Sequence, residues 1–487
     1  MTPSLIPSST TGDRLALDHR LSAIAAGGIA LGIYLLTLAP DLTWANGAYD
    51  GPELVTASAT LGVAHPPGYP TYIVLGKLFS LLPLGTVAFR YNLFSAVAAA
   101  AAVGLCVLII GTLFPRVRSS TALSAALLFG LAPLVWSQAV VAEIYSLNLL
   151  VIAGFLFIWS RRGASPLSGI FLGLAITTHL TSVFLLPGFI ARSHRQFPHT
   201  LIGIAIGLTP LLLLPILAGG GSPVVWGRPT DLAGWWWLAS GKLYNANYQL
   251  DLDSEHLRRL LQAIVFGPAA LLWTRRLAEI NPLPSVSYAH ETRPTRVILG
   301  ITAIIYLCFA LFYKTPDAAI LLLPPLLFTV IIAAPLMDRM GPAALILPLA
   351  LALVTFQSRD ISRTNVARPL ADQILLTAPD RAILLTPGDR TIFTLLYFQY
   401  AEGRRPDLRL IDSNLFAFDW YRDRLALQYP DLLVPEGDDL NSFQRINKPN
   451  RPFCLTSLVA PFTGYPGELI AIPKITGSPP FFSCTED

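Results

Sequence analysis

Long apolar segments recur through residues 1–356, and each is close to the length of a helix that crosses a bilayer, about 20 residues. So many of them cannot all be buried in a soluble core. The expected spans are 21–39, 91–113, 119–136, 143–160, 167–191, 200–218, 259–274, 297–312, 319–335 and 341–356. The run at 167–191 is too long for one span and is broken at ITTHLTS, which predicts two short helices and about eleven crossings in all.

Composition supports an integral membrane protein, because only 13% of the residues are charged against roughly 25% in a soluble domain. The arginines between the spans fall in alternate loops. Since positive charge is retained in the cytoplasm, this predicts a cytoplasmic N-terminus, with the first large loop (40–90) and the C-terminal region outside. The net charge of +4 reflects these arginines and does not indicate nucleic-acid binding.

The character of the chain changes after Phe356, where apolar spans stop and charged residues and prolines become frequent. We therefore expect a multi-span domain at 1–356 and a small extracytoplasmic α/β domain at 357–487. Within it, 381–387 and 407–412 are predicted strands and 388–403 a predicted amphipathic helix, an order that favours parallel strands. The chain as a whole is expected to be mainly α. Cys454 and Cys484 lie in this external region, where a disulfide is an open alternative to free thiols.

The stretch YDGPELVTASATLGVAHPPGYPTY follows the first apolar segment and carries an aspartate, a glutamate and a histidine. Asp50 and Glu53 have the spacing of a capping box, in which the first acid accepts hydrogen bonds from free helix amides and the second reaches back. This predicts a helix at about 51–62 lying along the membrane surface, then the HPPGYP turn and a second helix at 70–82. On spacing alone the two acids can be helix caps or catalysts, and both interpretations stay open.

Other ionisable side chains stand at the edges of the spans. Glu143 in VVAEIYSLN and His179 in ITTHLTS are costly near an apolar boundary unless they face a cavity or a partner. Arg90 and Lys314 border spans on the outer side, where basic side chains either reach lipid headgroups or bind a lipid phosphate. Each of these residues is a candidate for the site.

Metal and nucleotide chemistry are weakly indicated. His65 precedes two prolines, which is typical of a turn residue, and no second histidine or cysteine stands at metal-ligand spacing. A divalent ion held by Asp50, Glu53 and His65 remains an alternative to a metal-free site. The sequence has no Walker loop, no GxSxG elbow and no dinucleotide fingerprint after a strand. A transferase acting outside the cytoplasm would then need a lipid-borne donor.

The first loop resembles a known family. DLTWANGAYDGPELVTASATLGVAHPPGYPTYIVLGKLFSLLPLGTVAFRYNLFSA is similar to the first external loop of the polytopic family that contains the animal transmembrane O-mannosyltransferase acting on plexin-type receptor domains, with many bacterial relatives. The similarity continues through VVAEIYSLN, GLAITTHLT, FYKTPDAAILLLP and GDRTIFTLLYFQYAEGRRPDLRLID. This family looks like part of the GT-C class of membrane glycosyltransferases, which use polyprenyl-phosphate sugars. Its bacterial relatives imply a bacterial plasma membrane.

The resemblance implies roles for residues at matching positions. Asp50 corresponds to the acid of the first external loop and is the expected general base, with Glu53 supporting it or binding the acceptor. The order here is DGPE rather than the commoner DSGE, which leaves open which acid faces the substrate. Arg90 or Lys314 would hold the donor phosphate. The remaining residues expected to bind substrate or donor are His65, Tyr69, Glu143, His179 and Asp317.

The function implied is transfer of a sugar, most simply mannose, from a polyprenyl phosphate to an extracytoplasmic protein or glycan, with inversion and without a cofactor. Many spans and intramembrane ionisable groups also mark a transporter or flippase, which is the alternative. A non-catalytic scaffold presenting 357–487 is a third class. Against the transporter, the chain shows no two halves of matching hydropathy, and its acids cluster outside the first span.

Overall fold

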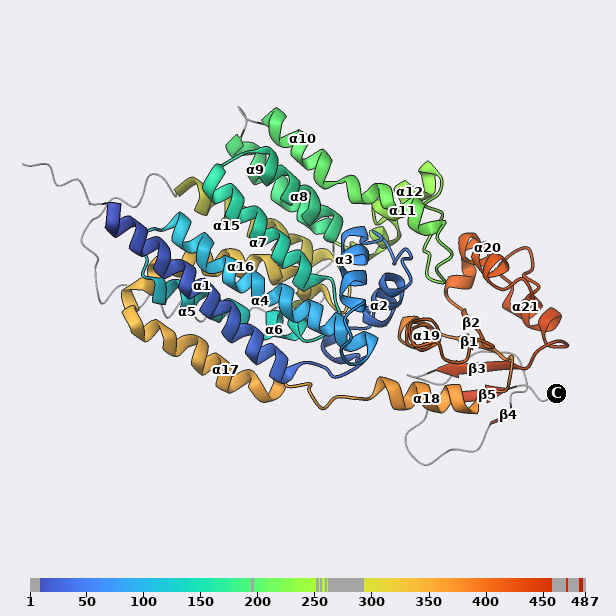
Figure 1. Cartoon of the computed structure of the whole chain (residues 1–487). Coiled ribbons are helices and arrows are strands. Elements are labelled where there is room, and N and C mark those ends of the chain that lie inside the picture. The colour runs from blue at the N-terminus through green and yellow to red at the C-terminus, as the bar shows by residue number, and fades with distance from the viewer. Residues whose placement is uncertain are drawn as a thin grey trace, which may run out of the picture.

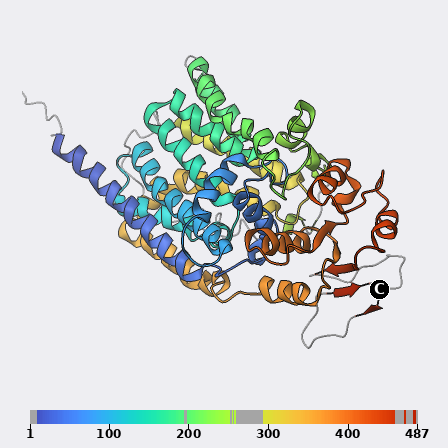
Figure 2. The same cartoon turned by 45° about the vertical axis from the view of Figure 1, so that its right-hand side comes forward.

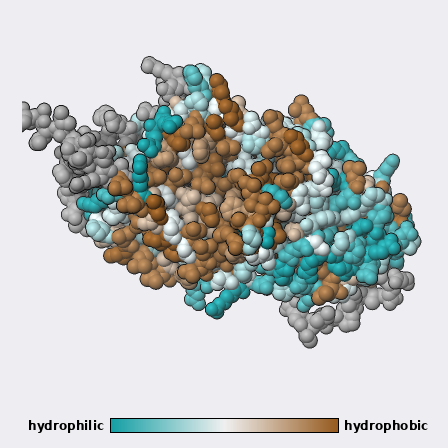
Figure 3. All heavy atoms as spheres, viewed as in Figure 1, coloured by the Kyte–Doolittle hydropathy of each residue, from teal (hydrophilic) through white to brown (hydrophobic). Residues whose placement is uncertain are grey.

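A computed structural model describes residues 9–193, 197–250, 254, 256–258, 261, 293–457, 470–471 and 481–484. The described chain is mainly helical: a bundle of long helices carries a smaller α/β module at one end (Figure 1). Turned by 45°, the module still projects from that end (Figure 2). Hydrophobic residues cover the visible face of the bundle, whereas hydrophilic residues cover most of the visible face of the module (Figure 3).

The bundle consists of apolar helices. They are α1 (Ser9–Thr37), α4 (Val87–Leu113), α5 (Ser119–Gly130), α6 (Pro133–Ala139), α7 (Tyr145–Arg162), α8 (Pro166–Thr178), α9 (Leu186–Ser193), α10 (Phe197–Gly207), α11 (Leu213–Ala218), α15 (Arg293–Phe312), α16 (Leu323–Met337) and α17 (Ile346–Arg359). Since a helix satisfies its own backbone hydrogen bonds, this is the architecture that apolar chains require in a bilayer.

Five helices of the described chain are long and apolar enough to cross a membrane, and the bent pair of α5 and α6, at 69°, would be a sixth. The five are Leu17–Thr37, Val87–Leu113, Pro198–Ala218, Pro294–Phe312 and the continuous helical run Ala318–Arg359. The last contains the two spans expected at 319–335 and 341–356, separated by a kink at Gly341. The span expected at 259–274 lies outside the described residues, so the expected eleven crossings are not confirmed.

The break predicted at ITTHLTS is confirmed. Helix α8 ends at Thr178, His179 is extended, and a 3₁₀ turn at Leu180–Leu185 leads into α9. The backbone at His179 is thus released from the helix at the end of the bundle that carries the module.

The first loop contains the two predicted helices, α2 (Gly51–Ala59) and α3 (Pro70–Ser80). All residues of the first helix from Gly51 to Ser58 are buried, so it is covered by protein, and its orientation along the membrane surface stays a prediction. The module packs against this helix through α19 (Asp389–Leu396), a contact that the sequence did not predict. Helix α2 is therefore enclosed between the bundle and the module.

The module contains a five-stranded mixed sheet in the order β2-β1-β3-β5-β4. Strands β1 (Ile383–Thr386), β2 (Arg409–Asp412) and β3 (Phe453–Ser457) are parallel, whereas β5 (Phe481–Cys484) is antiparallel to β3 and to β4 (Ile470–Ala471). The helices are α18 (Ala367–Thr377), α19, α20 (Asp419–Gln428) and α21 (Leu440–Asn447). The predicted parallel pair, with the predicted helix between its strands, is thus confirmed.

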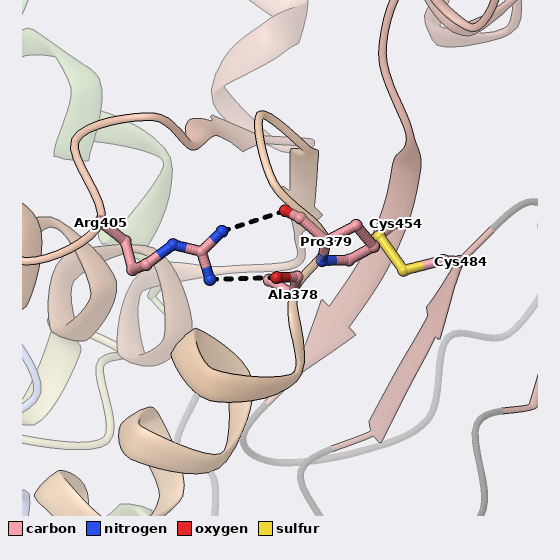
Figure 4. Close-up of a disulfide and its surroundings, with 5 residues drawn as sticks. All are labelled: Ala378, Pro379, Arg405, Cys454 and Cys484. Atoms are coloured by element: carbon pink, nitrogen blue, oxygen red, sulfur yellow. Dashed lines mark hydrogen bonds between the residues drawn. A yellow bond between two sulfur atoms is a disulfide. The ribbon is translucent and has the colours of Figure 1, made fainter.

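Two local devices stabilise the module. Cys454 and Cys484 pair across β3 and β5 and form a disulfide, so the open alternative is decided in favour of the bond. Nearby, the Arg405 guanidinium donates hydrogen bonds to the carbonyl oxygens of Ala378 and Pro379, each at 3.0 Å, and closes the turn that leads from α18 toward β1 (Figure 4).

The module is joined to the first loop by directional contacts. Arg368 of α18 bridges Asp41 of the first loop and Glu402 that follows α19, and all three side chains are at most one-quarter exposed. The Trp44 indole donates a hydrogen bond to Thr394 of α19 (3.1 Å). These contacts fix the position of α19 against α2.

Candidate active site

The first turn of α2 presents two acids in different environments. The Asp50 side chain is 41% exposed, whereas that of Glu53 is fully buried. Neither acid behaves as the capping box predicts. Asp50 occupies the N-cap position in an α-helical conformation and makes no capping hydrogen bond, and Glu53 is turned toward the HPPGYP segment. The cap-only interpretation is therefore wrong.

Glu53 instead holds His65. One Glu53 oxygen accepts the His65 backbone N–H at 2.8 Å, and the other lies 2.5 Å from the imidazole Nδ1. The opposite ring nitrogen, Nε2, is 3.8 Å from the Asp50 carboxylate. A carboxylate on one ring nitrogen fixes the orientation of the imidazole. His65 thus links a buried acid to an accessible one.

Charges within this group set its protonation. Burial alone would lower the pKa of His65. The adjacent carboxylates of Glu53 and Asp50 raise it by a larger amount, so the pKa is about 10. Although 41% of the Asp50 side chain is exposed, the protein around it removes enough water to raise its pKa to about 6, against the opposing effect of the His65 charge and with Glu53 adding to the rise. Near neutral pH, His65 is therefore an imidazolium and Asp50 an ionised carboxylate of raised basicity.

Close backbone contacts fix this turn. A Cβ added at Gly51 would lie 2.8 Å from the Ala142 carbonyl oxygen, so only glycine lets α2 approach the turn before α7 this closely. Val63 forms a parallel bridge with Val225. Gly68 has φ +89°, and a Cβ there would lie 2.8 Å from Leu214. The segment from Gly51 to Gly68 is therefore constrained by three other parts of the chain.

A second wall is formed by aromatic residues. Tyr69 meets the His65 ring edge-on at 5.0 Å between centroids and stacks on His179 at 6.3 Å. Tyr145 lies 5.6 Å from the same His179 ring, and its hydroxyl donates to Asp317 at 3.5 Å. Predicted residues of three motifs, His65 with Tyr69, His179 and Asp317, are thereby connected through side-chain contacts, with Tyr145 as a residue that was not predicted.

The other predicted residues take different positions. Glu143 is buried in the turn before α7, where its backbone exchanges hydrogen bonds with the Ser95 hydroxyl. The Arg90 guanidinium donates to the carbonyl oxygens of Ser80, Leu84 and Gly85, so it braces the turn after α3. The Lys314 backbone N–H donates to the Asn247 carbonyl oxygen, and Lys314 lies three residues before Asp317 in the sequence.

Metal binding by the acids of α2 finds no support in this arrangement. Within the described residues, no group of three histidine, cysteine, aspartate or glutamate side chains is placed to hold a metal ion. Both Glu53 oxygens already contact His65, one at the backbone N–H and the other at the imidazole Nδ1.

The module contributes residues that sequence reasoning missed. Arg390, in the first turn of α19, lies over the rings of Tyr49 (4.3 Å) and Trp44 (5.4 Å), and Tyr49 directly precedes Asp50. Asp389 beside it is close enough to raise the pKa of Asp50. Both follow the carboxyl end of β1, the edge of a parallel sheet where ligands usually bind. The GDR triplet after a predicted strand was therefore a usable signal.

Comparisons with known proteins found similar sequences over two parts of the chain. The model of the Protein O-mannosyl-transferase TMEM260 N-terminal domain matches residues 50–200, and that of TMEM260-associated domain 2 matches residues 367–431. The Mus musculus Protein O-mannosyl-transferase TMEM260 is 24% identical over 483 residues, which cover 87% of this chain and 67% of that protein. The Dictyostelium discoideum Protein O-mannosyl-transferase tmem260 is 31% identical over 136 residues, 27% of this chain and 16% of the relative.

A solved structure shares the fold. The crystal structure of ArnT from Cupriavidus metallidurans bound to undecaprenyl phosphate superposes with a TM-score of 0.57 at 14% identity, covering 95% of this chain and 97% of that one. The fold and the sequence relatives together define a membrane glycosyltransferase of the GT-C class. Within that class the chain is similar to the TMEM260 proteins over residues 50–200 and 367–431, as the resemblance of its first loop predicted.

Proposed function

We propose that this protein transfers a sugar, most simply mannose, from a polyprenyl phosphate to a hydroxyl group of an extracytoplasmic acceptor. The observation that supports this most directly is Asp50: an accessible carboxylate of raised basicity, beside an imidazolium that the buried Glu53 holds in place. The relatives named as O-mannosyltransferases suggest the sugar. Undecaprenyl phosphate in the crystal structure of ArnT suggests the lipid.

The chemistry requires one displacement. Asp50 withdraws the proton of the acceptor hydroxyl while that oxygen bonds to the anomeric carbon, and the bond from this carbon to the phosphate oxygen breaks. The polyprenyl phosphate leaves with both electrons of that bond, and the configuration of the sugar inverts. A cation near the leaving oxygen stabilises the charge that develops there. His65 keeps Asp50 ionised, while Tyr69 and His179 line the space for the sugar.

The proposed orientation follows the arginine distribution, with the N-terminus in the cytoplasm and the first loop and module outside. For the donor phosphate, Lys314 is the better of the two predicted cations. It lies close in sequence to Asp317, which contacts the aromatic wall, whereas Arg90 already serves three carbonyls. Lys314→Ala should weaken donor binding, with Arg90→Ala as the matched comparison. Unchanged donor affinity in both variants would show that neither Lys314 nor Arg90 binds the donor phosphate.

The test of function is consumption of polyprenyl-phosphate mannose by purified protein, with glucose and arabinose donors alongside, scored as released polyprenyl phosphate. Asp50→Asn keeps the shape of the side chain but removes the base. We expect its turnover to fall by about 10² to 10⁴ at unchanged thermal stability. Turnover that survived the substitution would show that Asp50 is not the base. Absence of turnover with every donor, together with donor movement across vesicles, would favour a flippase.

A further inference from the structure

A cleft lies between the first loop, residues 223–226 and the module, and we call it the module cleft. It is lined mainly by apolar and aromatic side chains, including Trp226, Phe393 and Trp420, with Arg424 on α20 and Glu53 of the active site also on its wall. The Trp226 ring lies 6.2 Å from His65 on one side and 5.5 Å from Trp420 on the other. The module cleft therefore begins beside the residues proposed to carry the chemistry.

One wall of the module cleft is an unpaired strand edge. The Val63 N–H donates to Val224 (2.9 Å), and the Trp226 N–H donates back to Val63 (3.1 Å). In this parallel bridge the N–H and C=O groups of Val225 point away from Val63. Val225 is buried, and its N–H and C=O have no hydrogen-bond partner within the described residues. Since buried backbone groups are almost always paired, this edge has room for one more strand.

The facing wall carries two donors without acceptors. Trp420 and Arg424 are one helical turn apart on α20, so they share a face. Both the Trp420 indole N–H and the Arg424 Nε–H are buried, and in the described part of the chain neither has a hydrogen-bond partner. A terminal nitrogen of Arg424 donates to the Ser222 carbonyl, which ties α20 to the 223–226 segment. Each of these buried, unpaired donors can bind an acceptor from outside the chain.

These features describe one kind of occupant. An extended polypeptide offers alternating N–H and C=O groups for Val225 on one side, carbonyl oxygens for Trp420 and Arg424 on the other, and side chains for the apolar walls. A glycan lacks the alternating amide groups. We propose that the module cleft binds the acceptor as an extended polypeptide, which adds a strand at Val225 and leads a serine or threonine hydroxyl to Asp50. This inference rests on the proposed function and names its acceptor.

The experiment measures binding without donor, using the full chain in lipid nanodiscs. The probe is a synthetic pool of short threonine-containing peptides that carry a benzophenone cross-linker, compared with the same pool N-methylated along the backbone. We expect cross-links to residues 223–226 and to α20, and a loss of roughly tenfold on backbone methylation, because the strand hydrogen bonds disappear. Trp420→Phe keeps an aromatic ring but removes the indole N–H. Like backbone methylation of the peptides, it should lower the labelling.

Trp236→Phe is the matched control, because this ring is 62% exposed and does not line the module cleft. Equal labelling by the methylated pool would overturn the proposal, as would labelling by a saccharide pool in place of the peptides. Since no donor is used, the two claims separate. A chain that captured peptides here but transferred no sugar would contradict only the proposed function. An active transferase that captured none here would contradict only the cleft.

Discussion

The packing of α1 against α4 differs from the packing of the first loop against the module. In the bundle, small residues let backbones approach: a Cβ added at Gly27 would lie 3.1 Å from the Ala100 carbonyl oxygen, and one at Gly104 would lie 3.1 Å from that of Ala23. Between loop and module the contacts are instead ion pairs, cation–π contacts and an indole hydrogen bond. Shape complementarity joins the first pair of elements, and directional polar contacts join the second.

This difference indicates that function depends on the contacts between the first loop and the module more than on the packing of α1 against α4. Close packing of small residues is what apolar helices need in a bilayer, and it does not require any one chemical group. Directional contacts fix distances and angles, which a site that moves a proton requires. We therefore expect substitutions between loop and module to change both stability and activity, and substitutions between α1 and α4 to change stability alone.

The largest effect is expected at Arg368. Arg368→Met leaves the carboxylates of Asp41 and Glu402 without their shared cation, and breaking such a poorly exposed group costs about 3 kcal/mol of unfolding free energy. Arg404→Met is the matched control: Arg404 pairs with the more exposed Asp372 and contacts the same Phe398 ring. Its cost should be about 1 kcal/mol or less. Equal losses of unfolding free energy in denaturant titrations of the two variants would show that the interface does not depend on Arg368 and its two carboxylates.

A similar but smaller effect is expected inside the module. The disulfide joins residues 30 positions apart, so replacing Cys454 and Cys484 with serine should cost about 3 kcal/mol or less, chiefly by freeing the unfolded chain. Chemical reduction of the natural protein should lower its melting temperature likewise. Cys308→Ser removes an exposed, unpaired cysteine and should leave the melting temperature unchanged. An unchanged melting temperature after reduction would argue against this bond.

In the bundle, Gly104→Ala should cost about 1 to 3 kcal/mol, because the new methyl group would press on the Ala23 carbonyl. Gly32→Ala makes the same change where nothing lies within 4 Å, and it should be close to neutral. Folded Gly104→Ala protein should transfer sugar at the natural rate. A slower rate per folded molecule would show that the bundle influences the site as the interface does.

Local patterns predicted much of this molecule. Apolar runs predicted the helices, the ITTHLTS break predicted the extended backbone at His179, and β-α-β order predicted the parallel strands. These features depend on neighbours in sequence, so they can be read from it.

The rest depends on contacts between distant segments. Glu53 has the spacing of a cap residue, yet it binds His65 twelve positions away because the turn at Val63 folds back. Burial of α2 and the presence of Asp389 both result from docking of a module more than 300 residues away in sequence. No local pattern carries that information, although the GDR triplet after a strand was a hint.

Loop and module together form the site. The pH dependence of sugar transfer by Asp389→Asn tests this most directly. Asp50 must be ionised to act, so the natural rate should fall as the pH drops through about 6. The charged groups that act on Asp50 include His65, Glu53, Asp389, Asp317 and Glu143. Removing the negative charge of Asp389 makes ionisation of Asp50 easier, which should move this fall to lower pH, while the exposed Asp438→Asn leaves it unchanged. An identical pH profile in Asp389→Asn would place the module outside the site.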